Sequence, residues 1–266
     1  MTAVSRSYDC SEPMERTRGI AEAVSAVRRG ELIVLPTDTV YGIGADAFTP
    51  TAVNALLEAK GRGRDMPSPV LVGSVRAAQA LVEDFGTYGQ DLVDEFWPGA
   101  LTLVCRASST LAWDLGDSKG TVAVRMPLHP LALELLKETG PLAVSSANRS
   151  GAPPARTAAE AEAQLGESVE VYLDDGASGE ADPSSIVDLT GAVPRLLRAG
   201  AISEERLREV CGVLLSDEDE PVADPAETAE ASQQDEPGEP LQKPDEAATA
   251  DEPVKKPADA DDPRAQ

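Results

Sequence analysis

The stretch LIVLPTDTVYG, residues 32–42, decides how this chain folds. Its four apolar residues at 32–35 predict a short buried strand, and Pro36 ends that strand because proline lacks the amide hydrogen that a sheet needs. Small hydroxyl and carboxyl side chains follow at once, at 37–39. This strand end could bind a carboxylate or a phosphate, although Pro, Asp and Thr also favour plain turns.

Three further segments place polar or cationic groups where an apolar run ends. They are KGRGR at 60–64, SSANRSG at 145–151 and PSSIVD at 183–188. None of them offers a strong general base, a metal-ligand cluster or a Cys–His pair. Such segments suit anionic substrates that carry their own reactivity, for example a nucleoside triphosphate and a carboxylate.

Helical and strand-like patterns are mixed along the chain. Predicted helices cover 12–29, 50–60, 76–85, 129–138, 157–165 and 203–211; predicted strands cover 32–35, 70–72, 100–106, 121–125, 142–144, 169–173, 185–189 and 195–198. Several strands follow one another with only loops between them. This favours an α/β domain with a mixed, twisted sheet and flanking helices over a doubly wound parallel sheet.

Residues 216–266 differ sharply in composition from the rest. They hold 17 acidic residues, 4 basic residues and 8 prolines, with no aromatic residue, and carry −13 of the formal net charge of −24. Such a segment cannot bury enough apolar surface to offset the entropy of the chain. We expect one folded domain over 1–215 and a disordered, acidic, proline-rich tail over 216–266.

Charge and cysteine content narrow the class of protein. An acidic chain is unsuited to coating nucleic acid, because that affinity comes from neutralising phosphates with Lys and Arg. Cys10, Cys105 and Cys211 are far apart, without metal-ligand spacing, and indicate a reducing compartment. No stretch approaches the roughly 18 apolar residues that span a membrane, and the polar N-terminus is unlike a signal peptide. We expect a cytoplasmic protein without a membrane partner.

Cations gather where the second predicted helix ends, at Lys60, Arg62 and Arg64. Cations at that end of a helix are stabilising for structural reasons, but they also recognise phosphates by charge and geometry. Thr121 and Arg125, four residues apart on a predicted strand, face the same side. Arg125 could hold a substrate carboxylate, or it could be an arginine on an edge strand in solvent.

Small polar residues follow the predicted strand at 142–144. Ser146 and Asn148 could bind phosphate through side chains and turned backbone amides, or they could form a plain turn. Ser146 is a poor candidate nucleophile, because no G-x-S-x-G elbow or nearby His supports it. Ser184 stands in a similar place before a later strand. His129, the only histidine, begins a helix and is expected to be structural.

Together these segments resemble the YrdC-like threonylcarbamoyl-AMP synthase family. The resemblance rests on LPTDTVYGIG at 35–44, AKGRGRDMP at 59–67, FWPGALTLV at 96–104, TVAVRMPLHP at 121–130, VSSANRSGAPP at 144–154, PSSIVDLT at 183–190 and LLRAG at 196–200. These stretches span roughly residues 31–200. The Lys-x-Arg and Ser-x-Asn pairs are the family's signature, and finding them together with PTDTVYG and WPGALTL is a specific signal.

The resemblance implies a twisted open mixed α/β sheet with a concave, positively charged face, in the short, single-domain form. It also implies a nucleotidyltransferase that combines L-threonine, bicarbonate or CO₂, and ATP into threonylcarbamoyl-AMP and pyrophosphate. Partner proteins would then transfer the threonylcarbamoyl group to N6 of adenosine at position 37 of tRNA. Mg²⁺ would arrive with ATP, since no carboxylate cage is visible in the sequence.

The resemblance also assigns three sets of site residues. The catalytic set is Lys60, Arg62, Ser146 and Asn148. The ATP-binding set is Lys60, Arg62, Arg64, Thr121, Asn148, Arg156 and Arg198. The threonine-binding set is Thr37, Arg125, Ser146 and Ser184. The chain departs from the family in one respect, because many relatives carry a histidine shortly after the Lys-x-Arg pair, where this chain continues into Gly73 and Ser74.

Two other functions fit the same residues. A non-catalytic module of this fold could bind double-stranded RNA or tRNA, although the net charge of −11 on residues 1–215 weakens this hypothesis. A paralogue could carry out a related carbamoyl-adenylate chemistry on another acceptor. We expect the acidic tail to be a solvating extension.

Overall fold

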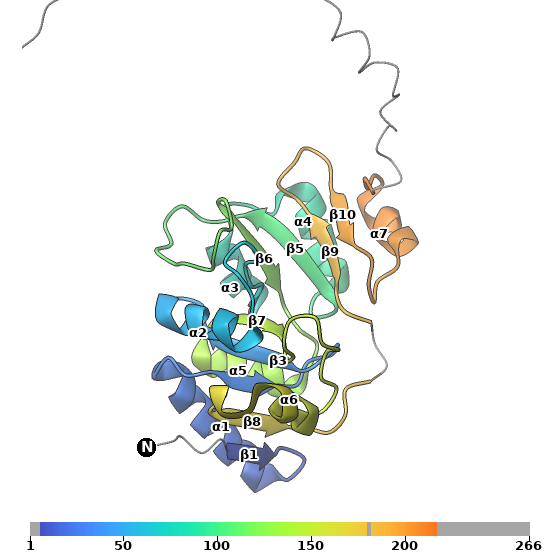
Figure 1. Ribbon diagram of the computed structural model, residues 1–266. Helices are drawn as coiled ribbons and strands as arrows, with labels where there is room; N and C mark the ends of the chain where they lie inside the picture. The colour runs from blue at the N-terminus through green and yellow to red at the C-terminus, as the bar shows by residue number, and fades with distance from the viewer. Residues whose placement is uncertain (1–5, 180–181, 217–266) are drawn as a thin grey trace, which may run out of the picture. The chain divides into compact units, whose positions relative to one another are not determined.

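One mixed sheet crosses the computed structural model, which describes residues 6–179 and 182–216 (Figure 1). Its strands are β1 (Arg6–Asp9), β2 (Ile33–Leu35), β3 (Gly42–Asp46), β4 (Val70–Leu71), β5 (Leu101–Arg106), β6 (Thr121–Arg125), β7 (Leu142–Ser146), β8 (Val171–Asp174), β9 (Ser185–Asp188) and β10 (Arg195–Arg198). They are arranged in the order β1-β8-β2-β3-β7-β4-β6-β5-β9-β10. Parallel pairs such as β5 with β9 occur beside antiparallel pairs such as β5 with β6, which confirms the predicted mixed sheet.

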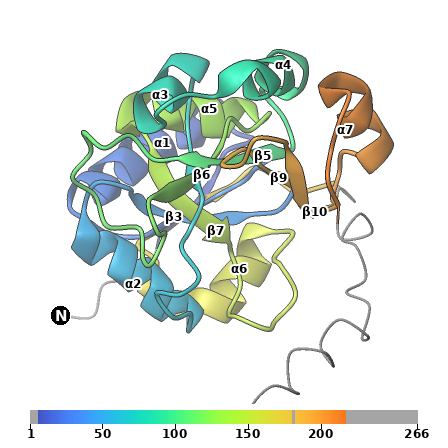
Figure 2. The ribbon, with the colours of Figure 1, turned by 90° about the horizontal axis from the view of Figure 1, so that it is seen from above.

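Helices connect and flank these strands. They are α1 (Pro13–Arg28), α2 (Pro50–Lys60), α3 (Val75–Leu81), α4 (Gly86–Phe96), α5 (Pro130–Thr139), α6 (Ala158–Leu165) and α7 (Glu204–Cys211), with a short 3-10 turn, η1 (Gly166–Ser168). The N-cap residues of helices α3, α6 and α7 are Ser74, Thr157 and Ser203. Each of their side chains accepts a hydrogen bond from the backbone N–H three residues later. Helix α7 lies at the β10 end of the sheet (Figures 1 and 2).

Alternation along the strands sends apolar side chains to both faces of the sheet. On one face, α2 and α6 pack over β2, β3 and β8. On the same face, α3, α4 and α7 pack over β4, β5, β6 and β9 in a second cluster. The two clusters lie on one face because Ala45, in the cluster under α2 and α6, pairs with Ala143, in the cluster under α3, α4 and α7. On the other face, α1 and α5 cover β2, β7 and β8.

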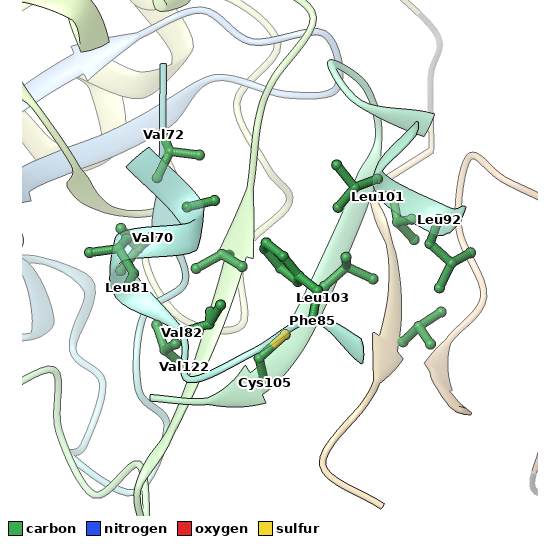
Figure 3. Packing of buried hydrophobic residues seen from close by; sticks show 14 of the residues in the cluster. Val70, Val72, Leu81, Val82, Phe85, Leu92, Leu101, Leu103, Cys105 and Val122 are labelled. Atoms are coloured by element: carbon green, nitrogen blue, oxygen red, sulfur yellow. The ribbon is translucent and has the colours of Figure 1, made fainter. Parts of the chain in front are cut away.

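The cluster under α3 and α4 fixes the central strands (Figure 3). Leu101, Leu103 and Cys105 alternate down β5 into this cluster, where they meet Leu81 of α3 and Leu92 of α4. Each of these side chains is almost completely buried, and burying one leucine contributes about 1.5–3 kcal/mol. Packing on this face therefore holds β5 in place and turns its alternate residues to the opposite face.

That opposite face of β5, β6 and β9 is not covered by any of the described helices. Val104, Ala123 and Ile186 point to it and are only half-buried, whereas Leu103 and Val124, which point into the cluster, are fully buried. The covered face supplies the stability of this half of the sheet. The open face is free to bind a ligand.

Two strands and one α-helix were not predicted: β1, β3 and α4. Strand β3 was missed because glycines such as Gly42 and Gly44 are uncommon in strands, yet a Cβ at Gly42 would lie 2.6 Å from the Val144 Cγ1, so glycine permits close packing there. Helix α4 contains two glycines, which hid its helical pattern. The helix predicted over 76–85 was too long: it ends at Leu81, because Val82 forms a β-bridge with Ala107.

The last described residues still belong to the folded domain. Leu215 still forms a parallel β-bridge with Arg195, and Ser216 is buried. Residues 217–266 lie outside the described residues, so their disorder stays a prediction. None of the described helices has the length and apolar character that crossing a membrane requires.

Candidate substrate-binding site

A cavity of about 340 Å³ opens on the uncovered face of the sheet. Its wall contains six of the residues that the sequence suggested: Thr37, Arg62, Arg125, Ser146, Ser184 and Arg198. Apolar side chains, among them Leu71 and Val144, complete the wall. Its size lies within the range of small-molecule sites, which typically combine an apolar lining with a few well-placed polar groups.

The register of the strands explains why distant residues meet here. Leu71 pairs with Arg125, and Ile186 pairs with both Thr102 and Arg198. Paired residues point to the same face of a sheet, and β5 runs beside β6. One row of side chains across β4, β6, β5, β9 and β10 therefore forms the floor of the cavity.

Arg125 is held at three points of its guanidinium group. Its Nη2 donates to the Asp38 Oδ1 over 2.6 Å, its Nη1 donates to the Thr39 Oγ1 over 3.1 Å, and its Nε donates to the Gly99 carbonyl over 2.9 Å. Burial lowers the pKa of Arg125 and the nearby Asp38 carboxylate opposes this shift. The guanidinium stays charged, because arginine does not lose its proton in proteins.

Thr37 shapes the loop that carries these partners. Its hydroxyl donates to the Val40 carbonyl over 2.6 Å and accepts from the Thr39 backbone N–H over 3.2 Å. The hydroxyl proton is therefore already engaged within the loop. Thr37 lines the cavity and at the same time fixes Thr39 against Arg125.

Ser184 and Arg198 form the other end of the floor. The Ser184 Oγ lies 2.9 Å from the Thr102 Oγ1, and Arg198 donates to the Ser184 carbonyl through Nε over 3.0 Å and Nη2 over 2.7 Å. Gly200 packs directly on this segment, because a Cβ there would lie 2.2 Å from the Pro183 carbonyl oxygen. Arg198 and Arg125 line the same cavity, and burial together with, to a smaller extent, the like charge of Arg125 lowers the pKa of Arg198.

Lys60 lies behind the cavity rather than on its wall. Its side chain is buried, and its ammonium group donates to the Ser146 carbonyl, to the Asn148 carbonyl over 2.7 Å and to the Asn148 Oδ1 over 3.4 Å. The Ser150 N–H donates to the Lys60 carbonyl over 2.8 Å. Burial, together with the charge of Arg62, lowers the pKa of Lys60 to about 8. Lys60 thus holds the loop after β7 from beneath.

Asn148 also supports this loop. Its Nδ2 donates to the carbonyls of Arg149 and Ala152 over 2.9 and 2.7 Å, and its side chain is buried. Ser146, two residues earlier, lines the cavity. The Ser-x-Asn pair therefore splits into a residue that faces the cavity and one that holds the turn behind it.

Arg62 is the least engaged cation of the site. Its Nη1 reaches the Ser145 Oγ only at 3.5 Å, and its buried Nε has no hydrogen-bond partner in the described structure. A buried guanidinium N–H without a partner costs free energy. The Arg62 guanidinium can therefore donate hydrogen bonds to an anion that enters the cavity.

Arg156 lines a second cavity, of about 650 Å³, beside the first. The two cavities share Val40, Pro154 and Pro183 in their walls. Glu160 lies in this wall and accepts a hydrogen bond from the Arg156 backbone N–H over 2.7 Å. A ligand longer than the first cavity can therefore extend toward Arg156.

Two predicted ATP-binding residues lie away from both cavities. Arg64 is exposed and forms an ion pair with Asp114 and a hydrogen bond of 2.9 Å with the Asn54 Oδ1. Thr121 points to the same face as Arg125, but at the other end of β6, where its hydroxyl donates to the Ser118 carbonyl over 2.8 Å. The structure therefore brings neither residue to the candidate site.

Thr102 was not predicted as a site residue, and Asp38 was predicted only as part of the strand end at 37–39, without a role of its own. Thr102 alternates with the buried leucines of β5, and a polar residue inside such a strand could have marked the open face. A side chain at Gly73 would be crowded, because a Cβ there would lie 3.2 Å from the Leu136 backbone carbon. Leu71 lines the cavity near Arg125.

The site carries no metal-ligand cluster, since the described residues include no group of three or more His, Cys, Asp or Glu side chains that could hold a metal ion. The three described cysteines are free and buried. His129 is half-buried, and its Nε2 lies 3.7 Å from the Asp175 Oδ2, outside the candidate site. Cations and hydroxyls are thus the chemical groups that the cavity offers.

Comparisons with known proteins agree with this architecture. Residues 25–200 match the Sua5/YciO/YrdC family model, described as "Telomere recombination". A Mycobacterium tuberculosis protein that is provisionally named threonylcarbamoyl-AMP synthase is 57% identical over 210 residues, which cover 79% of this chain and 97% of that protein. The Bacillus subtilis threonylcarbamoyl-AMP synthase is 37% identical over 209 residues, which cover 76% of this chain and 60% of that protein.

Solved structures show the same likeness. Pyrococcus abyssi Sua5 complexed with L-threonine matches with a TM-score of 0.73 and 34% identity, over 80% of this chain and 62% of that chain. E. coli YciO matches with a TM-score of 0.65 over 77% of this chain and 97% of that chain, and its 21% identity shows a shared fold alone. The family model covers most of the described residues, and this chain belongs to the Sua5/YciO/YrdC family.

Proposed function

We propose that this protein is a threonylcarbamoyl-AMP synthase, which joins L-threonine, bicarbonate or CO₂, and ATP. The observation that carries the proposal is the convergence of Arg62, Arg125 and Arg198 with several hydroxyls in one cavity. Guanidinium groups bind carboxylates and phosphates through charge and matching geometry. The names of the relatives, and the L-threonine complex of Pyrococcus abyssi Sua5, support the choice of substrates.

We place the amino acid over the floor of the cavity. Arg125 would receive the carboxylate of threonine, because three protein contacts already fix its guanidinium. Ser184 and Thr102 lie beside it and offer hydroxyls. Leu71 and Val144 form an apolar wall that suits a methyl group. A substrate with a carboxylate, a small apolar group and a polar group fits this surface.

The triphosphate would lie toward Arg62 and Ser146. The threonine amine attacks the carbon of CO₂ and loses a proton, which gives a carbamate. A carbamate oxygen then attacks the α-phosphorus of ATP, the bond from that phosphorus to the bridging oxygen breaks, and pyrophosphate leaves with the electron pair. The protein needs only to align the reactants and to neutralise charge. Arg62, with its unpartnered Nε, would bind a phosphate oxygen, and the adjoining cavity would accept the rest of the nucleotide toward Arg156.

Mg²⁺ would enter as part of the ATP substrate, because oxygen ligands from the phosphates are the ones that this ion commonly uses. The product would pass to the proteins that modify tRNA, which we place downstream of this enzyme, and we place the reaction in the cytoplasm. A direct role in RNA binding is the competing hypothesis.

Pyrophosphate release is the measurement that tests the proposal. The full chain is incubated with ATP, Mg²⁺, bicarbonate and L-threonine, and each component is omitted in turn. We expect release that depends on threonine and a product with the mass of threonylcarbamoyl-AMP. Release with a different amino acid would indicate a related chemistry on another acceptor. No release from a folded sample, together with RNA affinity that falls steeply with salt, would favour the binding module.

A further inference from the structure

Asp38 lies behind Arg125 and does not belong to the cavity wall. Its Oδ1 accepts from the Arg125 Nη2 over 2.6 Å and from the Leu128 backbone N–H over 2.9 Å. Its side chain is 14% exposed and that of Arg125 is 7% exposed. Asp38 therefore joins the loop after β2, the end of β6 and the segment that follows β6 at a single carboxylate oxygen.

The ion pair sets both the charge and the direction of Arg125. A buried cation without a counterion is costly, and it rearranges toward water when it can. Arg198 lines the same cavity as Arg125, and the like charges of the two guanidinium groups oppose each other. With Asp38 in place, Arg125 keeps its position beside a second cation. The guanidinium has five N–H groups, and the described contacts engage one on each nitrogen, so two remain for a ligand.

We propose that Asp38 is a positioning residue for the amino-acid substrate, because its carboxylate aims the Arg125 guanidinium into the cavity. The inference rests on the proposed function, in which Arg125 receives the carboxylate of threonine. Asp38 acts through Arg125 and does not touch the substrate. It is thus a determinant of threonine affinity, and its described contacts, with Arg125 and Leu128, do not include Arg62 or Ser146, toward which the triphosphate would lie.

The test compares Asp38→Ala and Asp38→Asn with a matched control, Asp46→Ala. Asp46 also joins a loop, since its carboxylate accepts from the Phe48 N–H over 3.0 Å and from the Thr49 hydroxyl over 2.7 Å, but it lies at the far end of β3 from the cavity. For each full-length variant, the KM values for threonine and ATP are measured by pyrophosphate release. Threonine binding is measured separately by calorimetry.

We expect Asp38→Ala to raise the threonine KM about tenfold or more, with the ATP KM within about twofold of the wild type. Asp38→Asn keeps an acceptor oxygen and a similar shape, so its threonine KM should lie between those of the wild type and Asp38→Ala. This variant serves as the test if the alanine variant does not fold. Asp46→Ala should behave like the wild type in both KM values.

An unchanged threonine KM in both Asp38 variants, or equal increases in the two KM values, would overturn the role of Asp38. A merely structural role would lower the melting temperature without separating threonine from ATP. The proposed function fails in a different way, since the wild-type protein would then release no pyrophosphate with threonine and would show no threonine heat in the calorimeter.

Discussion

The ammonium group of Lys60 lies 2.7 Å from the carbonyl oxygen of Asn148, which it contacts from behind the loop that follows β7. Two further acceptors, the Ser146 carbonyl and the Asn148 Oδ1, complete its surroundings, and no carboxylate pairs with it in the described structure. A lysine in this arrangement fixes backbone geometry. Its effect on catalysis would pass through the position of Ser146, which lines the cavity.

Replacing this lysine with methionine tests that role. Lys60→Met keeps much of the buried volume but removes the ammonium donor from the Ser146 and Asn148 carbonyls, which destabilises the loop. A displacement of about 1 Å at a reacting group can cost about a hundredfold in rate, and we expect kcat/KM to fall by that order. Steady-state pyrophosphate release measures it. Lys137→Met is the control, because Lys137 is exposed on α5. Equal kinetics for the two variants would contradict the role of Lys60.

The pKa of Lys60 predicts a dependence of stability on pH. Burial lowers that pKa from 10.5 to about 8 in the folded protein, so between these values the unfolded chain binds more protons. Below pH 8 the buried charge of Lys60 therefore lowers the free energy of unfolding. This loss of stability diminishes as pH rises toward 10.5. The relief amounts to at most about 3 kcal/mol.

Denaturant unfolding of the wild type and Lys60→Met, at pH 7 to 10, checks this sign. Other titrating groups are common to both proteins and cancel in the difference. We expect the stability of the wild type relative to the variant to increase with pH across this window. A difference that stays flat or decreases would show that the Lys60 pKa is not depressed.

The site residues that could be predicted from sequence stand at the boundary between an apolar strand and a polar loop. Thr37, Ser146 and Ser184 are of this kind, and each reaches the cavity. Such a transition is local, so it can be read along the chain. Whether a residue faces the ligand or supports a loop depends on contacts that are distant in sequence, and for this reason Lys60 and Asn148 could not be separated from Arg62 and Ser146.

Elements rich in glycine were harder to predict than strand ends. Gly42 and Gly44 lie in β3, and the missing side chain of Gly42 makes room for Val144 of β7. Glycines favour turns over strands, and the local sequence does not show which strand will pack against them. Likewise, the strand register that sets Leu71 and Arg125 in one row comes from the tertiary fold. The exposed position of Arg64 also depends on the tertiary fold.

Arg62 and Arg64 offer a matched pair of substitutions two residues apart. Arg62 lines the cavity with an unpartnered Nε, whereas Arg64 forms a surface ion pair with Asp114. Surface ion pairs contribute about 0–1 kcal/mol to stability. We expect Arg62→Ala to lower kcat/KM for ATP at least about tenfold more than Arg64→Ala does, since it removes a charge-assisted contact with a phosphate. Equal losses would place Arg64 at the nucleotide as well.

Removing residues 217–266 tests the predicted nature of the tail. The acidic, proline-rich composition cannot form a core, so a chain that stops after Ser216 should keep its kcat/KM and melting temperature. Steady-state kinetics and calorimetry of the full and shortened chains measure both. A large loss of either would mean that the tail contributes to the folded domain or to its site.

The contact between Gly42 and Val144 predicts a coupled pair of substitutions. A Cβ at Gly42 would lie 2.6 Å from the Val144 Cγ1, so Gly42→Ala should cost about 1–3 kcal/mol through overpacking. Val144→Ala removes the clashing methyl group, and the double variant should be more stable than the sum of the single effects by about 1 kcal/mol or more. Gly44→Ala is the control, because its nearest contacts would be an ordinary 3.5 Å. Urea unfolding of the four proteins of the cycle measures the coupling, and strictly additive effects would show that β7 yields to the added methyl group without strain.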